Sequence, residues 1–173
     1  MRRAFTLIEM MIAIVIFSLI VLFLYKSYDA LRQSNKKYIT VAKEMEKMWR
    51  IKKMLYLDFT LLIQSDVKVF NKKRSEDVVL LQTSNSLHNR FYPYVAYVVK
   101  EGTLYRLESL RKLSYPFDVQ TTADVDEICR VKQFRIYKTH KKENGTTVTY
   151  YLIDIELVDD RRILYKVRAL NES

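Results

Sequence analysis

Glycine, proline, cysteine and histidine are all scarce in this chain of 173 residues, which holds two glycines, two prolines, two histidines and one cysteine. Two distant glycines, Gly102 and Gly145, cannot form the glycine-rich loops that hold phosphates or dinucleotides. The single cysteine, Cys129, excludes an intrachain disulfide and a cysteine-based zinc cage. The composition argues against most familiar enzyme classes, and we expect no catalytic residue, no metal site and no cofactor.

Apolar residues and positive charge are abundant instead. The apolar share is 49%, and 30 lysines and arginines stand against 20 acidic residues, for a net charge of +10. An apolar share this high excludes a disordered chain, and the length suits one domain.

The longest apolar run covers residues 5–25 and reads FTLIEMMIAIVIFSLIVLFLY, with Glu9 as its one charge. A helix of this length is about 31 Å long, close to the ~30 Å hydrocarbon core of a bilayer. A cleaved secretory signal has a shorter apolar region followed by small residues, whereas bulky and charged residues follow here. A buried helix would need cover on every side, so we predict a membrane span.

Glu9 is unusual because a carboxylate inside an apolar span costs a few kcal/mol unless it has a partner or lies near the headgroups. It belongs to a distinctive order of residues: the basic leader Met1-Arg2-Arg3, the small Ala4, then Phe5-Thr6-Leu7-Ile8-Glu9 and the apolar run. This N-terminal segment resembles the type IV prepilin and type II secretion pseudopilin family.

The resemblance implies how the N-terminus is processed. Prepilin peptidase would cut between Ala4 and Phe5, and the new N-terminal Phe5 would be N-methylated. The family usually has glycine where this chain has Ala4. The resemblance also implies filament assembly through Glu9, which would meet the α-amino group of a neighbouring subunit's Phe5. Such a buried pair fixes the axial register more than it adds stability, because desolvation offsets much of the attraction.

The same resemblance implies a location and partners. The chain would lie in the bacterial inner membrane as a single-pass protein, with a cytoplasmic N-terminus and a periplasmic head, and then enter a filament. Its partners would be other pilin or pseudopilin subunits, prepilin peptidase, an assembly platform and inner-membrane lipid. Charge counting favours the opposite orientation, because more lysines and arginines follow the span than precede it. The rule is reliable mainly for short loops, so we follow the leader motif.

After the span, residues 26–65 are predicted to continue the helix as an amphipathic segment. Apolar residues recur at three- and four-residue spacing and should face a core. They are Val41, Met45, Met48, Trp49, Leu55, Tyr56, Phe59, Leu62 and Ile63. The stretch 26–58 carries nine lysines and arginines and four acids, which suits anionic headgroups or acidic neighbours.

From residue 66 the apolar period changes from 3.6 to 2, which predicts strands. The predicted strands are residues 67–70, 78–82, 94–99, 104–110, 134–139, 148–157 and 163–169. Glu101-Gly102 and Asn144-Gly145 predict tight hairpins, and Asp159-Asp160 predicts a turn between the last two strands. Residues 111–130 are predicted to be a long irregular segment.

The expected fold class is therefore α+β: a long helix packed on a mainly antiparallel sheet, in a pilin-like lollipop. The expected parts are a leader over residues 1–4, a transmembrane helix over 5–25, its amphipathic continuation over 26–65 and a β-rich head over 66–173. Within the family, the stretch from Leu87 to Ser109 is most similar to large minor pseudopilins of the J type and related minor pilins.

Other side-chain groups have simpler interpretations than a functional site. Asp124, Asp126 and Glu127 could bind calcium, but the EF-hand spacing and its glycine are absent. Cys129 reads as a buried apolar residue, and His88 and His140 as surface residues beside strands. The tyrosines Tyr92, Tyr94, Tyr97 and Tyr105 suggest a stacking platform, but half-buried strands explain them more simply.

Two functions remain open at this point. The first is a structural subunit, a minor pilin or pseudopilin at or near the tip of a type II secretion pseudopilus or type IV pilus. The alternative is a single-pass membrane-anchored protein with a basic cytoplasmic domain that binds nucleic acid. DNA would suit the charge, but charge alone does not separate DNA binding from solubility. A membrane-anchored enzyme is a weaker third interpretation, because no residue set supports one.

Overall fold

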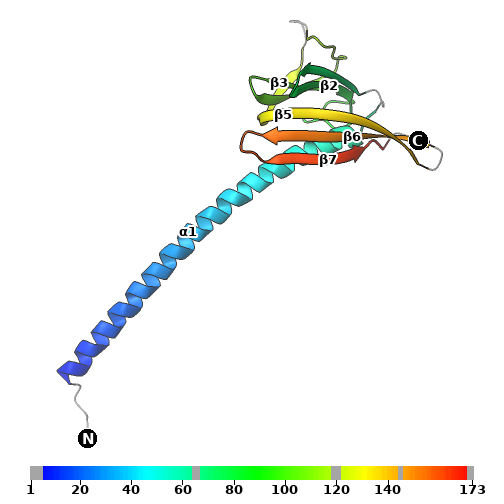
Figure 1. Cartoon of the computed structure of the whole chain (residues 1–173). Coiled ribbons are helices and arrows are strands. Elements are labelled where there is room, and N and C mark those ends of the chain that lie inside the picture. The colour runs from blue at the N-terminus through cyan, green and yellow to red at the C-terminus, as the bar shows by residue number, and fades with distance from the viewer. Residues whose placement is uncertain (1–5, 64–66, 118–121, 144–145, 171–173) are drawn as a thin grey trace. The chain divides into compact units, whose positions relative to one another are not determined.

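The computed structural model describes residues 6–63, 67–117, 122–143 and 146–170. It contains one long helix, α1 (Leu7–Thr60), followed by seven strands in chain order. Figure 1 shows both parts. The chain divides into two compact units, Met1–Trp49 and Arg50–Ser173. The second unit contains the last turns of α1 and the whole sheet, so the predicted α+β class is confirmed.

The strands are β1 (Lys68–Lys73), β2 (Glu76–Gln82), β3 (Tyr94–Lys100), β4 (Thr103–Ser109), β5 (Asp124–Glu143), β6 (Thr146–Leu157) and β7 (Arg162–Arg168). Consecutive strands pair antiparallel, in the order β1 to β7. A single parallel pairing, Glu76 with Phe134, also joins β2 to β5. All seven predicted strands are present.

The strand β5 is longer than predicted, because it begins at Asp124 and not at Phe134. Its first part, Asp124–Arg130, pairs with β4 and its remainder with β6. The prediction of an irregular segment over residues 111–130 was therefore wrong for residues 124–130. The acidic residues there hide the period-2 pattern, and pairing with β4 gives the segment its extended conformation.

The predicted turns have two outcomes. Glu101 and Gly102 join β3 to β4 with φ angles of 52° and 73°, the conformation that a two-residue hairpin turn requires. Asp159 and Asp160 lie between β6 and β7, also as predicted. Asn144 and Gly145 lie outside the described residues.

The core of the second unit lies between the end of α1 and one face of the sheet. Ile51, Leu55 and Phe59 are buried on α1, and the ring of Phe59 lies 5.4 Å from that of Tyr151 on β6. The prediction of one core-facing stripe is confirmed for Leu55, Phe59 and Leu62. It was wrong for Val41, Met45, Trp49 and Tyr56, whose side chains are at least half exposed. Helical spacing predicts which residues share an apolar face, but it does not predict which part of that face is buried by other residues.

The opposite face of strands β1 to β4 carries a second apolar cluster. Val78, Leu80 and Ala96 pack there against Leu113, with Phe70 and Tyr115 at the margin. Leu113 and Tyr115 come from the irregular segment after β4, which covers this face of the sheet. The four-stranded part of the sheet thus has apolar cover on both faces.

Candidate functional site

The first candidate site is the N-terminal turn of α1. Thr6 stands just before the helix, and its hydroxyl Oγ1 accepts a hydrogen bond from the Glu9 backbone N–H at 3.4 Å. The Glu9 carboxylate accepts in return from the Thr6 backbone N–H and hydroxyl, both at 2.9 Å. This reciprocal pattern is a capping box, in which two otherwise unpaired helix-end donors are satisfied. The Thr-x-x-Glu spacing could have been read from the sequence as this cap, a signal that the sequence analysis missed.

Of the predicted site residues, Glu9 lies in the described part of the chain and is exposed. Ala4 and Phe5, the predicted cleavage and methylation residues, lie outside the described residues. The capping box places the Glu9 carboxylate at the beginning of the helix. A carboxylate is also favoured here by the positive end of the helix dipole.

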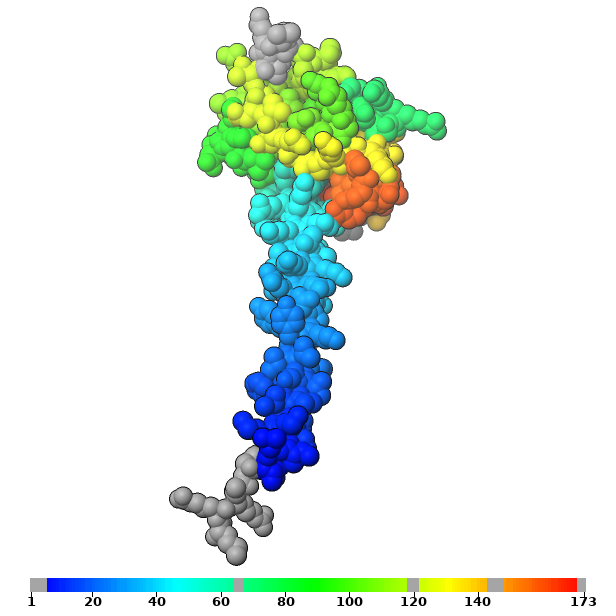
Figure 2. Space-filling model, turned by 90° about the vertical axis from the view of Figure 1, so that its left-hand side faces the viewer, coloured from blue at the N-terminus to red at the C-terminus, as the bar shows by residue number. Residues whose placement is uncertain are grey.

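The apolar segment that follows Glu9 has no cover within the described chain. Its large side chains between Leu7 and Tyr25 are 46% to 82% exposed. Figure 2 shows the side chains of this segment in blue, uncovered along the visible face. Within the described residues α1 is the one helix long and apolar enough to cross a membrane. A surface of this kind needs lipid or other apolar helices around it.

The second feature is a buried ionic cluster inside the second unit. Arg106 on β4 and Asp58 on α1 are both fully buried, and Arg106 Nε donates to Asp58 Oδ2 at 2.8 Å. Arg106 Nη1 donates to Glu108 at 2.5 Å. Asn85 donates to Asp58 at 2.7 Å, and the Tyr97 hydroxyl donates to the same carboxylate. The cluster therefore joins α1, β3, β4 and the loop after β2.

The cluster holds more negative than positive charge, and protein hydrogen-bond donors compensate its carboxylates. One guanidinium faces two carboxylates, and Glu108 also accepts from the Ser86 hydroxyl at 2.5 Å and the Leu87 N–H at 2.9 Å. Burial acts to raise the Glu108 pKa, but these hydrogen bonds outweigh it and the pKa is lowered. Burial and the neighbouring Asp58 raise the pKa of Tyr97 well above its usual value. Because the ion-paired side chains are fully buried, the contacts of the cluster join α1 to the sheet.

Sequence analysis did not identify this cluster. Leu104, Arg106 and Glu108 alternate along β4, so the two charged residues share the face of a core leucine. Likewise Asp58 falls between Leu55 and Phe59 on the buried side of α1. Charged residues at core positions could have indicated a buried ionic cluster. Which of these charges form ion pairs depends on how α1 packs on the sheet.

Two residues of the acidic cluster, Asp124 and Asp126, form ion pairs within the second unit. Asp126 lies 2.9 Å from His88 Nε2, and Asp124 pairs with Arg90. Both contacts tie the loop after β2 to the beginning of β5. The hydrogen bond to Asp126 is the largest cause of a raised His88 pKa. No group of three or more potential metal ligands occurs among the described residues.

The cysteine, the second histidine and the tyrosines that the sequence analysis considered do not form a common site in the described residues. Cys129 is buried, as its prediction as a small apolar residue requires. His140 lies on the surface, 3.1 Å from the Thr149 hydroxyl. The four tyrosines do not form one platform, because Tyr97 is fully buried whereas Tyr92 is 44% exposed in the loop before β3.

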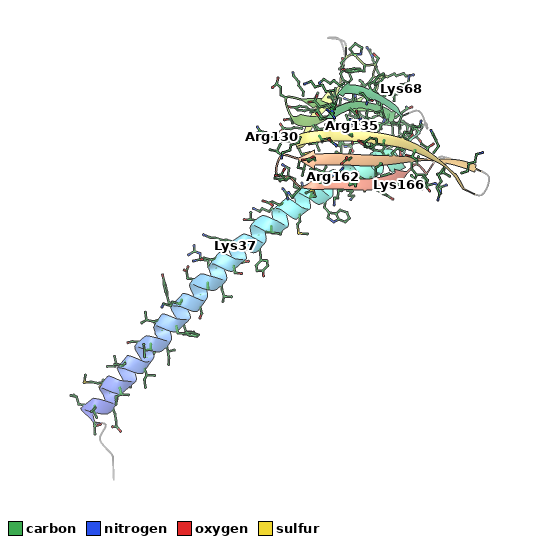
Figure 3. The ribbon with its side chains drawn as sticks, in the orientation of Figure 1. Lys37, Lys68, Arg130, Arg135, Arg162 and Lys166 are labelled. Atoms are coloured by element: carbon green, nitrogen blue, oxygen red, sulfur yellow. The ribbon has the colours of Figure 1, made fainter. Side chains whose placement is uncertain are left out.

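Several basic side chains lie on the strands β5 to β7. Figure 3 labels Arg135, Arg162 and Lys166 there. Arg162 pairs with Asp154 at 2.7 Å and Arg135 lies 3.3 Å from Asp77, while Lys166 lies 3.7 Å from the ring of Tyr150. Internal partners thus already engage these three cations, which weakens the argument for a dedicated nucleic-acid surface.

A capped, exposed apolar helix with a carboxylate in its first turn, followed by a β-rich unit, fits a protein anchored in a membrane. Residues 1–25 match the family described as the prokaryotic N-terminal methylation motif. This match supports the resemblance of the N-terminal segment to prepilins and pseudopilins. The motif points to a structural subunit, and the family implies assembly with other pilin subunits and processing by prepilin peptidase. No curated protein and no solved structure matches the chain.

Proposed function

We propose that this chain is a minor pilin or pseudopilin, a structural subunit at or near the tip of a type IV pilus or type II secretion pseudopilus. The observation that carries the proposal is the methylation motif over residues 1–25, joined to an apolar helix without cover of its own. The function is assembly: the helix is held in the membrane, then packs beside the helices of other subunits.

In this proposal, prepilin peptidase cuts between Ala4 and Phe5 on the cytoplasmic face, and Phe5 is N-methylated. The head then lies in the periplasm before the subunit enters the filament. The motif and the long apolar helix both fit anchoring in an inner membrane. Cleavage removes Arg2 and Arg3, and with them the positive charge that precedes the span.

Glu9 sets the register between subunits in this proposal. Its capping box holds the carboxylate at the first turn of α1, where an α-amino group from a neighbouring Phe5 can approach it. Apolar contacts between helices are similar at many axial shifts of one helix along the other. An ion pair in apolar surroundings forms at only one of these shifts, because its two charges must meet. The pair thus selects one arrangement among many that bury similar apolar area.

The tip position rests on the resemblance of residues 87–109 to J-type minor pseudopilins. It predicts low copy number, and immunogold labelling of the head should mark filament ends. Labelling along the whole filament would assign the chain as a major subunit instead.

Intact mass spectrometry of the protein purified from its membrane tests the proposal. The expected mass lacks residues 1–4 and carries one added methyl group, placed on Phe5 by fragmentation. A host without prepilin peptidase is the control and should give the full-length mass. Retention of Arg2 and Arg3 in the peptidase-containing host would overturn the proposal and favour a simple membrane anchor.

A further inference from the structure

A cavity of about 350 Å³ opens on the sheet face opposite α1, between strands β1 to β3 and the segment after β4. Leu80, Leu113 and Phe70 give it apolar walls. The ring of Tyr115 lies 5.5 Å from that of Phe70 and closes one side. The cavity is at the small end for ligand sites, which usually have about 300–1,000 Å³. It therefore suits a group the size of one or two residues better than a large cofactor.

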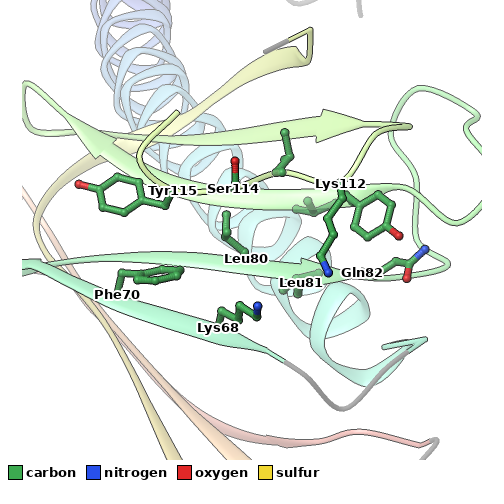
Figure 4. A pocket seen from close by; sticks show the side chains of 11 residues that line it. Lys68, Phe70, Leu80, Leu81, Gln82, Lys112, Ser114 and Tyr115 are labelled. Atoms are coloured by element: carbon green, nitrogen blue, oxygen red, sulfur yellow. The ribbon is translucent and has the colours of Figure 1, made fainter. Parts of the chain in front are cut away.

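Positive charge lies at this apolar cavity. Lys68 on β1 and Lys112 on the covering segment both line it. Figure 4 shows the Lys112 side chain extending from the covering segment toward β2, across from Lys68. Among the described residues that line the cavity, none is acidic. An apolar group that carries a carboxylate would match both the walls and the charge.

The strand beside the cavity offers a way to hold a polypeptide. β1 is the first strand in the sheet order, so one of its edges has no neighbouring strand in the described parts of the chain. An extended segment that pairs with this edge would place alternate side chains on the face of Lys68 and Phe70. Its last side chain would enter the cavity while its terminal carboxylate meets Lys112.

From these observations we infer that the cavity binds the C-terminal residue of a partner polypeptide, one with a large apolar side chain and a free carboxylate. The partner adds as a strand to β1, its apolar side chain packs against Leu80 and Leu113, and its carboxylate lies beside Lys112. The inference rests on the second unit alone and is independent of the processing of the N-terminus.

Binding to the full chain in detergent micelles tests the inference. The probe is a dye-labelled peptide, Ser-Gly-Ser-Gly-Leu with a free carboxylate, followed by fluorescence anisotropy. Three competitors are used: the same peptide as its C-terminal amide, a peptide ending in serine, and 4-methylpentanoate, which has the leucine side chain and carboxylate without a peptide backbone. We expect each to bind at least about fivefold more weakly than the probe, a factor that corresponds to about 1 kcal/mol.

Two variants test the role of the lysine. Lys112→Gln should weaken binding of the probe at least about fivefold by removing a charge at the carboxylate. The matched control is Lys100→Gln, which removes another exposed lysine, at the far end of β3, and should leave binding unchanged. Because Lys112 is exposed, we expect both variants to fold, and near-ultraviolet circular dichroism checks that they do.

Hydrogen exchange gives a second, independent measurement. Bound peptide should slow exchange of backbone amides in β1, because strand addition pairs them. Failure of the probe to bind, equal binding of the amide, an unaffected Lys112→Gln variant or unchanged exchange in β1 would each overturn the inference. Equal binding of 4-methylpentanoate would also overturn it, because the site would then take a small apolar acid and not a polypeptide.

Discussion

Arg106 and Asp58 lie 48 residues apart and form a two-point ion pair inside the second unit, with Nε to Oδ2 at 2.8 Å and Nη2 to Oδ1 at 3.2 Å. Both side chains are fully buried. The pair fixes the last turns of α1 on β4 in one orientation, because a guanidinium and a carboxylate meet in a defined plane. Apolar packing of Leu55 and Phe59 alone would not define that orientation as sharply.

Arg106→Met should destabilise the protein strongly. The substitution keeps much of the side-chain volume but leaves Asp58 and Glu108 buried without a cation, at a cost of about 3–5 kcal/mol. Urea unfolding of the full chain in detergent, followed by near-ultraviolet circular dichroism, measures the change. The control is Lys132→Met, which breaks an exposed pair with Asp160 and should lower the stability far less, because solvent screens an exposed pair. Similar losses in the two variants would contradict this role of the buried cluster.

Glu108 should make the protein sensitive to acid. Its folded-state pKa is lowered by hydrogen bonds that outweigh burial, so its ionised form stabilises the folded state above the ordinary pKa of 4.5. This contribution is lost as the pH falls from 4.5 through the lower folded-state pKa. We expect the free energy of unfolding to fall less steeply below pH 5 in Glu108→Gln than in the wild type. Parallel pH profiles would show that Glu108 does not contribute.

His88 should titrate above its ordinary pKa of 6.5, chiefly because its ring bonds to Asp126. A raised pKa stabilises the folded state at pH values below 6.5, and this contribution is lost as the pH rises through the folded-state value. Asp126→Asn should lower the His88 pKa, as measured by NMR titration of the imidazole. Asp160→Asn, far along the chain and paired with Lys132, should not lower it. A His88 pKa unchanged by Asp126→Asn would disprove this pairing in solution.

Thr6 and Glu9 together cap α1, but their substitutions should have different effects on incorporation into the filament. Glu9→Gln keeps an acceptor for the Thr6 N–H but removes the charge, and we expect filament incorporation to fall about tenfold or more, since the neighbouring α-amino group in the proposed filament would lose its counter-charge. Thr6→Val keeps the charge and loses both hydrogen bonds of the Thr6 hydroxyl, so incorporation should persist. Immunoblots of sheared filaments measure it, and membrane fractions verify that both variants insert. Equal loss would mean that the cap matters and the charge does not.

The hairpin between β3 and β4 should respond oppositely at its two turn residues. Gly102 has a φ of +73°, so Gly102→Ala places a Cβ in the left-handed region and should cost about 1 kcal/mol. Glu101 also has a positive φ, of 52°, which asparagine tolerates better, so Glu101→Asn should stabilise the protein by a few tenths of a kcal/mol. Thermal unfolding of the two variants measures both shifts. A lower midpoint for Glu101→Asn would contradict the assigned turn.

Much of this protein could be predicted from local patterns. The apolar run and the order of residues 1–9 predict the helix and its family segment, because a span and a processing motif are defined by consecutive residues. Period-2 alternation found all seven strands, and Glu101-Gly102 located a hairpin from turn chemistry alone. The amino-terminal half of β5 was missed because its acidic residues hide the period-2 pattern, and their partners, Arg90 and His88, come from a distant loop.

The sequence by itself determined the long helix, the seven strands apart from the first half of β5, the hairpin at Glu101-Gly102, and which end of the chain is apolar. Tertiary structure alone decided which apolar residues of α1 are covered, since Leu55 and Trp49 follow the same spacing but only Leu55 is buried. It also decided that Asp58 meets Arg106, and that two lysines share one cavity. The physical reason is that local patterns arise from neighbours along the chain, whereas burial and charge pairing depend on residues brought together by folding.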